Sequence, residues 1–507
     1  MPPPERPAGA GPALPGWVWL LGWAVLAVGI GLLVRLPGPA TLDPDEHAAV
    51  LYLDRLVAGE RLEEPLLSSP KPLLTVVHGL AWRAGHDWRP LEALTVAAFA
   101  LAVVCLARAA ARLGGLPAAA ATVLAVAGSG PLVLQAARGN SMVFALAGWS
   151  LALDVLTWGT GRDQGGRGPA WGLAAGALLL AGLARAESWL LLPLAAAYGL
   201  VAWRRGDRRA VLLVVPLAAP LLWLAHDWLL TGDPLYAIRV PGRYTDLVSG
   251  RQVVPPADWL ALVARRYLAA PLLLALAAAG AVWLVRRRAW LWLATLGATG
   301  IGTLALLGLQ AWQGTYISWR YFDPADLALR LTAALGAAAL ATSVAGRLSR
   351  TGHTVAGPGA VAGALLLVGM ACWPLAPADR LVDSTLDRDT RLSANAATAI
   401  TALAPVAAEP GSVLAVSGPQ RLRVAVELGL PLERVRDLFL AGRAAPLDQA
   451  LTGSTAVFHD ADGDRPPERF APLSATVPTR VGELRLVPLR TAPGRGLYVH
   501  RVEEPGG

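Results

Sequence analysis

The chain has 507 residues, of which 55% are hydrophobic and only 16% are charged. This composition excludes an ordinary water-soluble protein, in which about a quarter of the residues are charged. The net charge of +8 comes from arginines grouped in short loops beside apolar runs, which indicates membrane orientation and no nucleic-acid partner. The two cysteines, Cys105 and Cys372, both lie inside apolar runs, so no disulfide framework is expected.

Eleven apolar runs are predicted to cross the membrane as helices, because backbone groups in lipid must be satisfied within their own segment. They lie near residues 17–36, 92–111, 117–134, 142–158, 170–184, 189–203, 210–230, 267–285, 289–309, 325–346 and 355–377. The first run has a longer apolar stretch than a secretory signal and a weakly basic N-terminal flank. It is therefore expected to be a retained helix rather than a cleaved signal.

The basic loops predict the orientation. With residues 1–16 as a cytoplasmic tail, the four most basic short loops all fall on the cytoplasmic side, as the positive-inside rule requires. These loops are residues 159–168, 204–209, 286–288 and 347–350. The segments expected on the outer face are 38–91, 135–141, 231–266, 310–324 and everything after 378.

The first outer segment, residues 38–91, contains two helical patterns. EHAAVLYLDRLVAG has an amphipathic pattern and is expected to lie along the membrane surface. The run PLLTVVHGLAW that follows Lys71 is too short to span and is expected to be interfacial or re-entrant.

Residues 378–507 have the composition of a soluble domain, predicted to be an extracytoplasmic α/β unit. The patterns predict helices at 393–408 and 421–430, and strands at 411–418, 454–460, 483–490 and 496–502, separated by Gly and Pro turns. The predicted fold is thus an all-α membrane bundle of about eleven spans, residues 17–377, with a C-terminal α/β domain.

The sequence LDPDEHAAV directly after the first span holds Asp43, Asp45 and Glu46. Two carboxylates beside the membrane could supply a general base with a supporting acid, or Asp43 and Asp45 could bind a divalent metal. The alternative is a solvated turn that Asp-Pro initiates, with Glu46 opening a helix.

Lys71, the only lysine of the chain, stands between two prolines in SSPKPLL. An ammonium at the membrane surface suits a lipid phosphate, although an interfacial lysine can also simply anchor a re-entrant turn.

Further polar residues gather in the other outer segments. Ionisable groups near membrane depth usually pair or line a polar cavity. Arg185 and Glu187 could therefore form an ion pair without further purpose, and the others could simply anchor helix ends. The candidates for substrate binding are Arg138, Arg185, Glu187, Tyr236, Arg243, Arg320 and Tyr321, and Asn140 lies beside the first of them.

The pair Asp45-Glu46, the later Lys71-Pro72-Leu73-Leu74 and the late Arg320-Tyr321, in this order between spans, resemble the GT-C class of membrane glycosyltransferases. The likeness is to its protein O-mannosyltransferase and lipid A aminoarabinose transferase branch, over roughly residues 15–350. The resemblance implies that Asp45 acts as base toward the acceptor with Glu46 in support. It also implies that Lys71 meets the lipid phosphate and that Arg320 and Tyr321 lie near the donor. Members often carry an acidic residue near the position of Asn140.

The function implied is transfer of a sugar from a polyprenyl-phosphate donor to a hydroxyl of a glycan, lipid or protein acceptor on the outer face. Such a donor needs no nucleotide, which fits the absence of nucleotide-binding motifs in the sequence. No cofactor is required, and a divalent metal is an option. The alternatives are a polytopic transporter or lipid flippase, and a membrane scaffold whose outer domain binds a partner.

Overall fold

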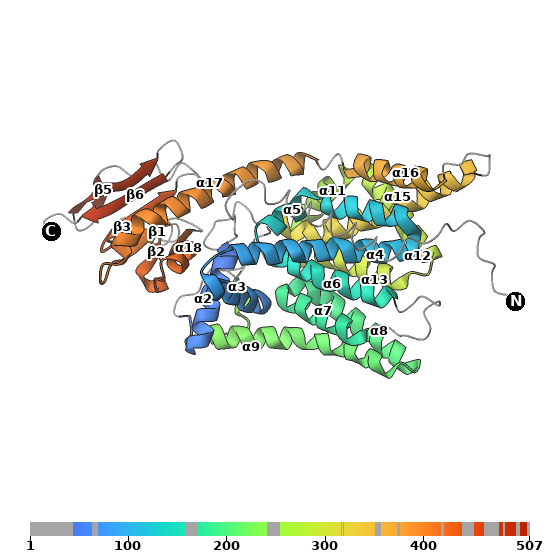
Figure 1. The fold of residues 1–507 in the computed structure, drawn as a ribbon, viewed down its shortest axis with the longest axis horizontal. Coiled ribbons are helices and arrows are strands. Elements are labelled where there is room, and N and C mark those ends of the chain that lie inside the picture. The colour runs from blue at the N-terminus through green and yellow to red at the C-terminus, as the bar shows by residue number, and fades with distance from the viewer. Residues whose placement is uncertain are drawn as a thin grey trace.

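The molecule is elongated, with a helical bundle at one end and a six-stranded sheet at the other (Figure 1). Helix α17 (Ala376–Ala407) connects them, and helices α2 (Pro44–Ala58) and α3 (Pro72–Gly85) lie at their junction. The computed structural model describes residues 44–62, 69–158, 170–240, 254–315, 317, 319–349, 356–372, 376–416, 420–438, 451–460, 476–479, 482–492 and 497–503.

The helices of the bundle range from 8 residues in α5 to 39 in α4, and many begin at or beside a proline. Proline stands at the first or second position of α2, α3, α4, α5, α8, α9, α11, α12 and α15, where the missing N–H and the fixed φ are compatible with a helix start. The elements are α4 (Arg89–Ala127), α5 (Gly130–Ala137), α6 (Ser141–Trp158), α7 (Trp171–Ala184), η1 (Ala186–Leu191), α8 (Leu192–Arg204), η2 (Arg208–Ala218), α9 (Ala219–Thr231), α11 (Pro256–Leu268), α12 (Pro271–Arg286), α13 (Trp290–Gly297), η4 (Ala298–Gly302), α14 (Thr303–Trp312), η5 (Trp319–Phe322), α15 (Asp323–Ser349) and α16 (Ala356–Cys372).

By length and composition, six helices of the described chain can cross a membrane, or seven if α11 and α12, which meet at 88°, form one bent span. The six are Arg89–Ala127, Ser141–Trp158, Ala186–Arg204, Arg208–Thr231, Trp290–Trp312 and Arg320–Leu348. The protein is therefore a multi-pass membrane protein, but the predicted count of about eleven spans is not confirmed.

The difference from eleven has identifiable causes. The run at 17–36 lies outside the described residues. The runs at 92–111 and 117–134 both fall in α4, whose helical geometry breaks at Gly114 and at Gly115, where φ is +67°. Helices α7 and α16 have 14 and 17 residues, fewer than the roughly 20 that a perpendicular span requires.

The C-terminal region, from α17 to the last strand, contains a mixed sheet of order β2-β1-β3-β6-β5-β4. Strand β1 pairs in parallel with β2 and β3, and the remaining pairs are antiparallel. The predicted strands and helices are present, whereas the short β2 and β4 were not predicted. The elements are β1 (Leu414–Val416), α18 (Gln420–Glu427), η7 (Leu432–Arg434), β2 (Val435–Asp437), β3 (Ala456–Asp460), β4 (Thr476–Thr479), β5 (Gly482–Ala492) and β6 (Leu497–Glu503).

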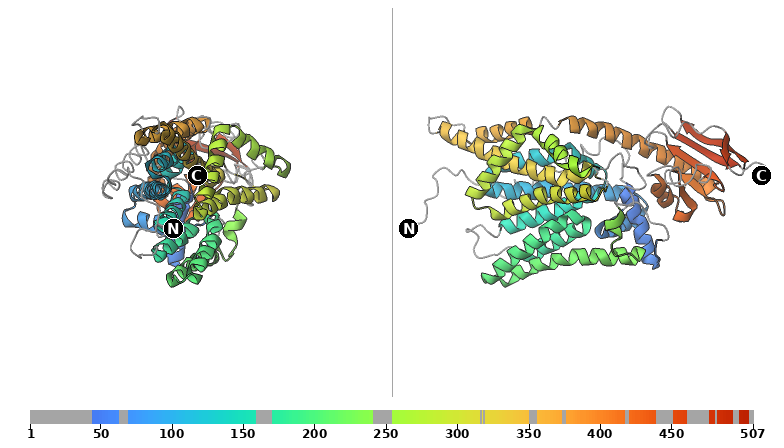
Figure 2. Two further views of the ribbon diagram at one scale, coloured as in Figure 1. Left: turned by 90° about the vertical axis from the view of Figure 1, so that its right-hand side faces the viewer. Right: turned by 180° about the vertical axis from the view of Figure 1, so that it is seen from behind.

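Helix α2 is present where predicted, but its surroundings differ from the expected membrane surface. Residues 46–50 are all buried. On one side Ala48 and Tyr52 share a hydrophobic core with α17 and the sheet, and on the other Ala49 packs with Leu74 and Ala145 of the bundle. The apolar stripe of α2 therefore faces protein on both sides. Viewed from behind, α9 lies along the bundle and reaches α2 (Figure 2).

Candidate active site

The predicted acidic pair and the predicted lysine both lie at helix starts. Asp45 and Glu46 belong to the first turn of α2, which we call the acidic turn, where carboxylates favour the positive end of the helix. Lys71 immediately precedes α3 and has extended backbone angles (φ −123°, ψ 112°), as expected for a residue before proline. Its carbonyl accepts the first helical hydrogen bond, from Thr75 N at 2.9 Å.

A contact between α2 and α3 joins these two starts. The carboxylate of Glu46 meets Nδ1 of His78, and both side chains are fully buried. Burial, with a smaller effect of the nearby Lys71, lowers the pKa of His78 to about 3. The imidazole is therefore neutral at physiological pH. His78 was not predicted as a site residue, because a single histidine in an apolar run gives no signal in the sequence.

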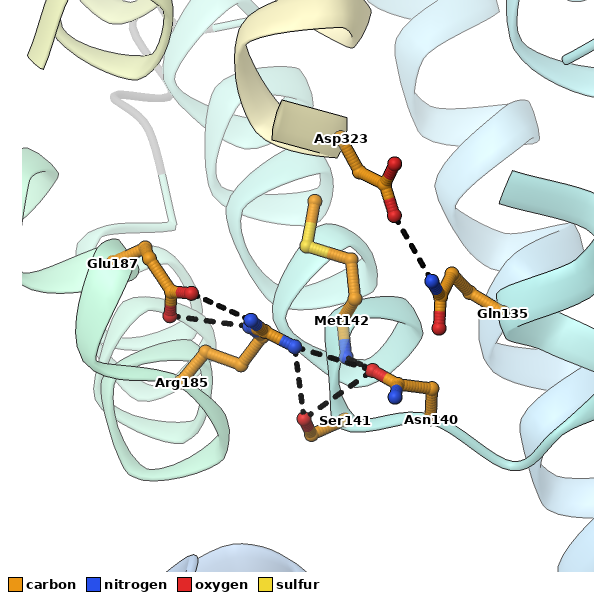
Figure 3. Close-up of polar contacts among 7 residues, drawn as sticks. All are labelled: Gln135, Asn140, Ser141, Met142, Arg185, Glu187 and Asp323. Carbon is orange, nitrogen blue, oxygen red and sulfur yellow. Dashed lines mark hydrogen bonds and ion pairs between the residues drawn. The ribbon is translucent and has the colours of Figure 1, made fainter. Parts of the chain in front are cut away.

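Arg185 and Glu187 form the ion pair that the sequence left as one of two alternatives (Figure 3). Arg185 ends α7 and Glu187 lies in the first turn of η1. The guanidinium donates to both carboxylate oxygens, Nε to Oε2 at 3.1 Å and Nη2 to Oε1 at 2.5 Å. This two-point geometry fixes the plane of the guanidinium. Lys71, which precedes α3, is close enough to act electrostatically on Glu187.

Asn140 extends this group to the start of α6. Its Oδ1 accepts from Arg185 Nη1 at 3.2 Å and from the backbone N–H of Met142 at 3.0 Å, which caps the helix (Figure 3). An acidic residue here would also accept both bonds and would add a charge beside Glu187. Among the described residues, the buried Nδ2 of Asn140 has no hydrogen-bond partner.

The start of α15 closes the site. Asp323 is buried and accepts a hydrogen bond from Gln135 Nε2 of α5 at 3.0 Å (Figure 3). Arg320 and Tyr321 precede it in η5, with the guanidinium carbon 5.8 Å from the tyrosine ring centre. Both act electrostatically on Arg185, which in turn acts on Asp323. Gln135 was not among the predicted binding residues.

The remaining predicted residues have different outcomes. Arg138 ends α5, two residues before Asn140, and Tyr236 is buried in the segment after α9. Arg243 and Asp43 lie outside the described residues, and for Asp45 the structure describes only the backbone, in α2. Within the described chain, no three His, Cys, Asp or Glu side chains are grouped as metal ligands, so a metal at Asp43 and Asp45 stays a prediction.

The polar residues thus converge on the end of the bundle that faces the C-terminal region. No protein-family model and no curated protein sequence matches the chain. It is similar in structure to ArnT from Cupriavidus metallidurans in the apo state, with a TM-score of 0.55 at 16% identity over 95% of this chain and 98% of that one.

A second similar structure is the archaeal oligosaccharyltransferase AglB from Archaeoglobus fulgidus, in complex with an inhibitory peptide and a dolichol-phosphate. Its TM-score is 0.51 at 13% identity, over 88% of this chain and 70% of that one. Both structures are GT-C glycosyltransferases. The chain therefore has the GT-C fold that its sequence resembles.

Proposed function

We propose that the protein is a membrane glycosyltransferase that transfers a sugar from a polyprenyl-phosphate donor to an acceptor hydroxyl on the outer face of the membrane. The observation that carries this proposal is the Glu46–His78 contact, which brings the acidic turn of α2 against the helix that Lys71 opens. The first turn of α2, with the carboxylate of Glu46, thereby packs against the helix that Lys71 precedes, in a chain with a GT-C-like fold.

The residues provide each part of the reaction. The carboxylate of Asp45 takes the proton from the acceptor hydroxyl, and the oxygen then attacks the anomeric carbon of the sugar. The bond between that carbon and the phosphate oxygen breaks, and its electron pair leaves with the polyprenyl phosphate. Lys71 and Arg320 stabilise the negative charge of the departing phosphate.

The donor class is supported by two observations. AglB, which has the same fold, is described in complex with a dolichol-phosphate. In this chain Lys71 acts electrostatically on Glu187, and Arg320 acts on Arg185, the ion-pair partner of Glu187, so these three cations are within electrostatic range of one group. A phosphate with a lipid tail would place its headgroup among them.

A substitution in the acidic turn tests whether Asp45 is the general base. Asp45→Asn keeps the shape of the side chain but removes its basicity, and the loss of a general base lowers the rate by about 10²–10⁴-fold. Asp54→Asn is the matched control, since Asp54 is an exposed carboxylate on the same helix, paired with Arg83. Glu46→Gln should have a smaller effect than Asp45→Asn because Glu46 supports the base.

The assay is transfer of labelled mannose or aminoarabinose from polyprenyl-phosphate donors by the purified protein in detergent. No sealed compartment exists there, so transfer also separates this function from the alternative, a transporter or flippase. Activity of Asp45→Asn within a few-fold of the parent would refute the assigned base. Failure of the parent to transfer either sugar to a glycan, lipid or peptide acceptor would refute the proposed function.

A further inference from the structure

The acidic turn lies between the bundle and the C-terminal region. Ala49 of α2 packs against Leu74 and Ala184 of the bundle, while Ala48 and Tyr52 lie in one core with the C-terminal region. Because packed side chains transmit small displacements rather than absorb them, the position of α2 depends on both partners.

A chain of polar and aromatic contacts leads from the C-terminal region to the residue beside Glu46. The imidazole of His47 meets the ring of Trp88 edge-on, with 4.8 Å between ring centres and 70° between planes. Trp88 also stacks on Trp82 of α3 at 4.2 Å. Its indole Nε1 donates to Oε1 of Glu427 in α18 at 3.2 Å. Glu427 lies 339 residues further along the chain than Trp88.

Glu427 is itself held in place by the C-terminal region. The same oxygen, Oε1, accepts from Arg423 Nε at 2.7 Å, and Arg423 Nη1 donates to Ser393 Oγ of α17 at 2.7 Å. The Arg423–Glu427 pair is mostly buried, with 13% and 19% of the side chains exposed. The carboxylate of Glu427 is therefore held in one orientation when it accepts the hydrogen bond from Trp88 Nε1.

We propose that the C-terminal region positions the acidic turn of α2 through the contacts Glu427–Trp88–His47. Trp88 and Glu427 are positioning residues, and the C-terminal region is part of the catalytic unit rather than an appended module. The consequence for catalysis rests on the proposed glycosyltransferase function. A displacement of about 1 Å at a reacting group can lower a rate by about 10²-fold, so even a modest release of α2 should be measurable.

The same interface offers a matched control. Arg55, near the C-terminal end of α2, donates from Nη2 to Glu433 Oε1 at 2.8 Å, and the Glu433 side chain is 44% exposed. This ion pair crosses from α2 to the C-terminal region, but away from the acidic turn. Arg55 keeps a second partner, Glu60, when Glu433 is removed.

The test compares the full-length parent with Trp88→Phe, Glu427→Ala and Glu433→Ala. Trp88→Phe removes the N–H donor and the second ring of the indole but keeps an aromatic ring against Trp82, so it should fold even if Glu427→Ala is unstable. Hydrogen exchange of the amides of residues 45–58 reports how firmly α2 is held in place, without any need for activity. Steady-state transfer then separates kcat from the donor KM.

We expect Trp88→Phe and Glu427→Ala to speed exchange in the first two turns of α2 and to lower kcat about tenfold. The donor KM should stay within twofold, and Glu433→Ala should change neither quantity. Exchange in Trp88→Phe and Glu427→Ala that equals the Glu433→Ala control would overturn the inference, as would faster exchange with unchanged kcat. A parent that transfers no sugar refutes the proposed function instead, while the exchange data still decide whether the C-terminal region fixes α2.

Discussion

Helices α12 and α15 touch backbone to backbone, which gives a prediction of stability. A Cβ built on Gly280 would lie 1.9 Å from the carbonyl oxygen of Thr332, and one on Gly336 would lie 2.0 Å from that of Leu276. Both obstacles are backbone atoms, so no rotamer change relieves them, and the helices must separate by roughly 1 Å or more. Overpacking of this kind costs about 1–3 kcal/mol or more. Alanine regains about 1 kcal/mol of helix propensity over glycine.

We therefore expect Gly336→Ala to lower the free energy of unfolding by about 2 kcal/mol. This is the upper end of the overpacking cost less the gain in helix propensity, because backbone atoms must be displaced. The measurement is the thermal unfolding midpoint of purified protein in detergent. Gly346→Ala is the control in the same helix, since a Cβ there meets nothing within 4 Å and should be neutral or stabilising. In Gly280→Ala/Gly336→Ala the second change should cost less than it does alone, because the helices are already apart. A midpoint for Gly336→Ala equal to that of Gly346→Ala would refute the reasoning.

Three further predictions concern the site and its orientation. Lys71→Ala should weaken binding of polyprenyl phosphate roughly 10–100-fold, because a charge-assisted contact is lost. Arg83→Ala, at the far end of α3, should leave the affinity unchanged. If Lys71→Ala bound polyprenyl phosphate as tightly as the parent, Lys71 would have no phosphate role. Arg205→Cys, in a chain without its native cysteines, should resist an impermeant thiol reagent in intact cells whereas Glu503→Cys should react, and the reverse pattern would invert the topology. The unfolded form of His78 titrates near 6.5 and the folded form, with its pKa lowered by burial and Lys71, near 3. Between these pH values the unfolded chain binds more protons than the folded one, so the free energy of unfolding falls as the pH drops, by at most about 1.4 kcal/mol per pH unit. His78→Gln should reduce this dependence of the free energy of unfolding on pH. An unchanged pH dependence would contradict a buried neutral imidazole.

Much of the fold could be predicted because its signals are local. Apolar runs identify helices, and the ten predicted runs that fall on described residues all contain helix. The positions of Asp45, Glu46 and Lys71 at helix starts follow from the prolines beside them. The short strands β2 (VRD) and β4 (TVPT) were missed because charged residues or a proline interrupt their apolar pattern, whereas the equally short β1 lies in a continuous apolar run.

The features that could not be predicted are contacts between residues that lie far apart in the sequence. The amphipathic stripe of α2 has the same pattern whether it faces lipid or protein, so the sequence could not reveal the C-terminal region against Tyr52. The Gln135–Asp323 and Trp88–Glu427 hydrogen bonds join residues 188 and 339 positions apart. No periodicity in a single sequence encodes such pairs.

The site residues share one structural position, which explains how a mostly apolar bundle can hold them. Glu46 lies in the first turn of α2, Lys71 precedes α3, Asn140 caps α6, Arg185 precedes η1 and Asp323 begins α15. The first backbone N–H groups of each helix lack an intrahelical partner, so acceptors such as Glu46, Asn140 and Asp323 are favourable there even beside a lipid-facing bundle, whereas the cations Lys71 and Arg185 gain nothing from these groups. The same N–H groups and the helix dipoles favour an anion. Under the proposed function, several helix starts would stabilise a departing lipid phosphate together with Lys71 and Arg320. Removal of one cation should therefore weaken donor binding without abolishing it.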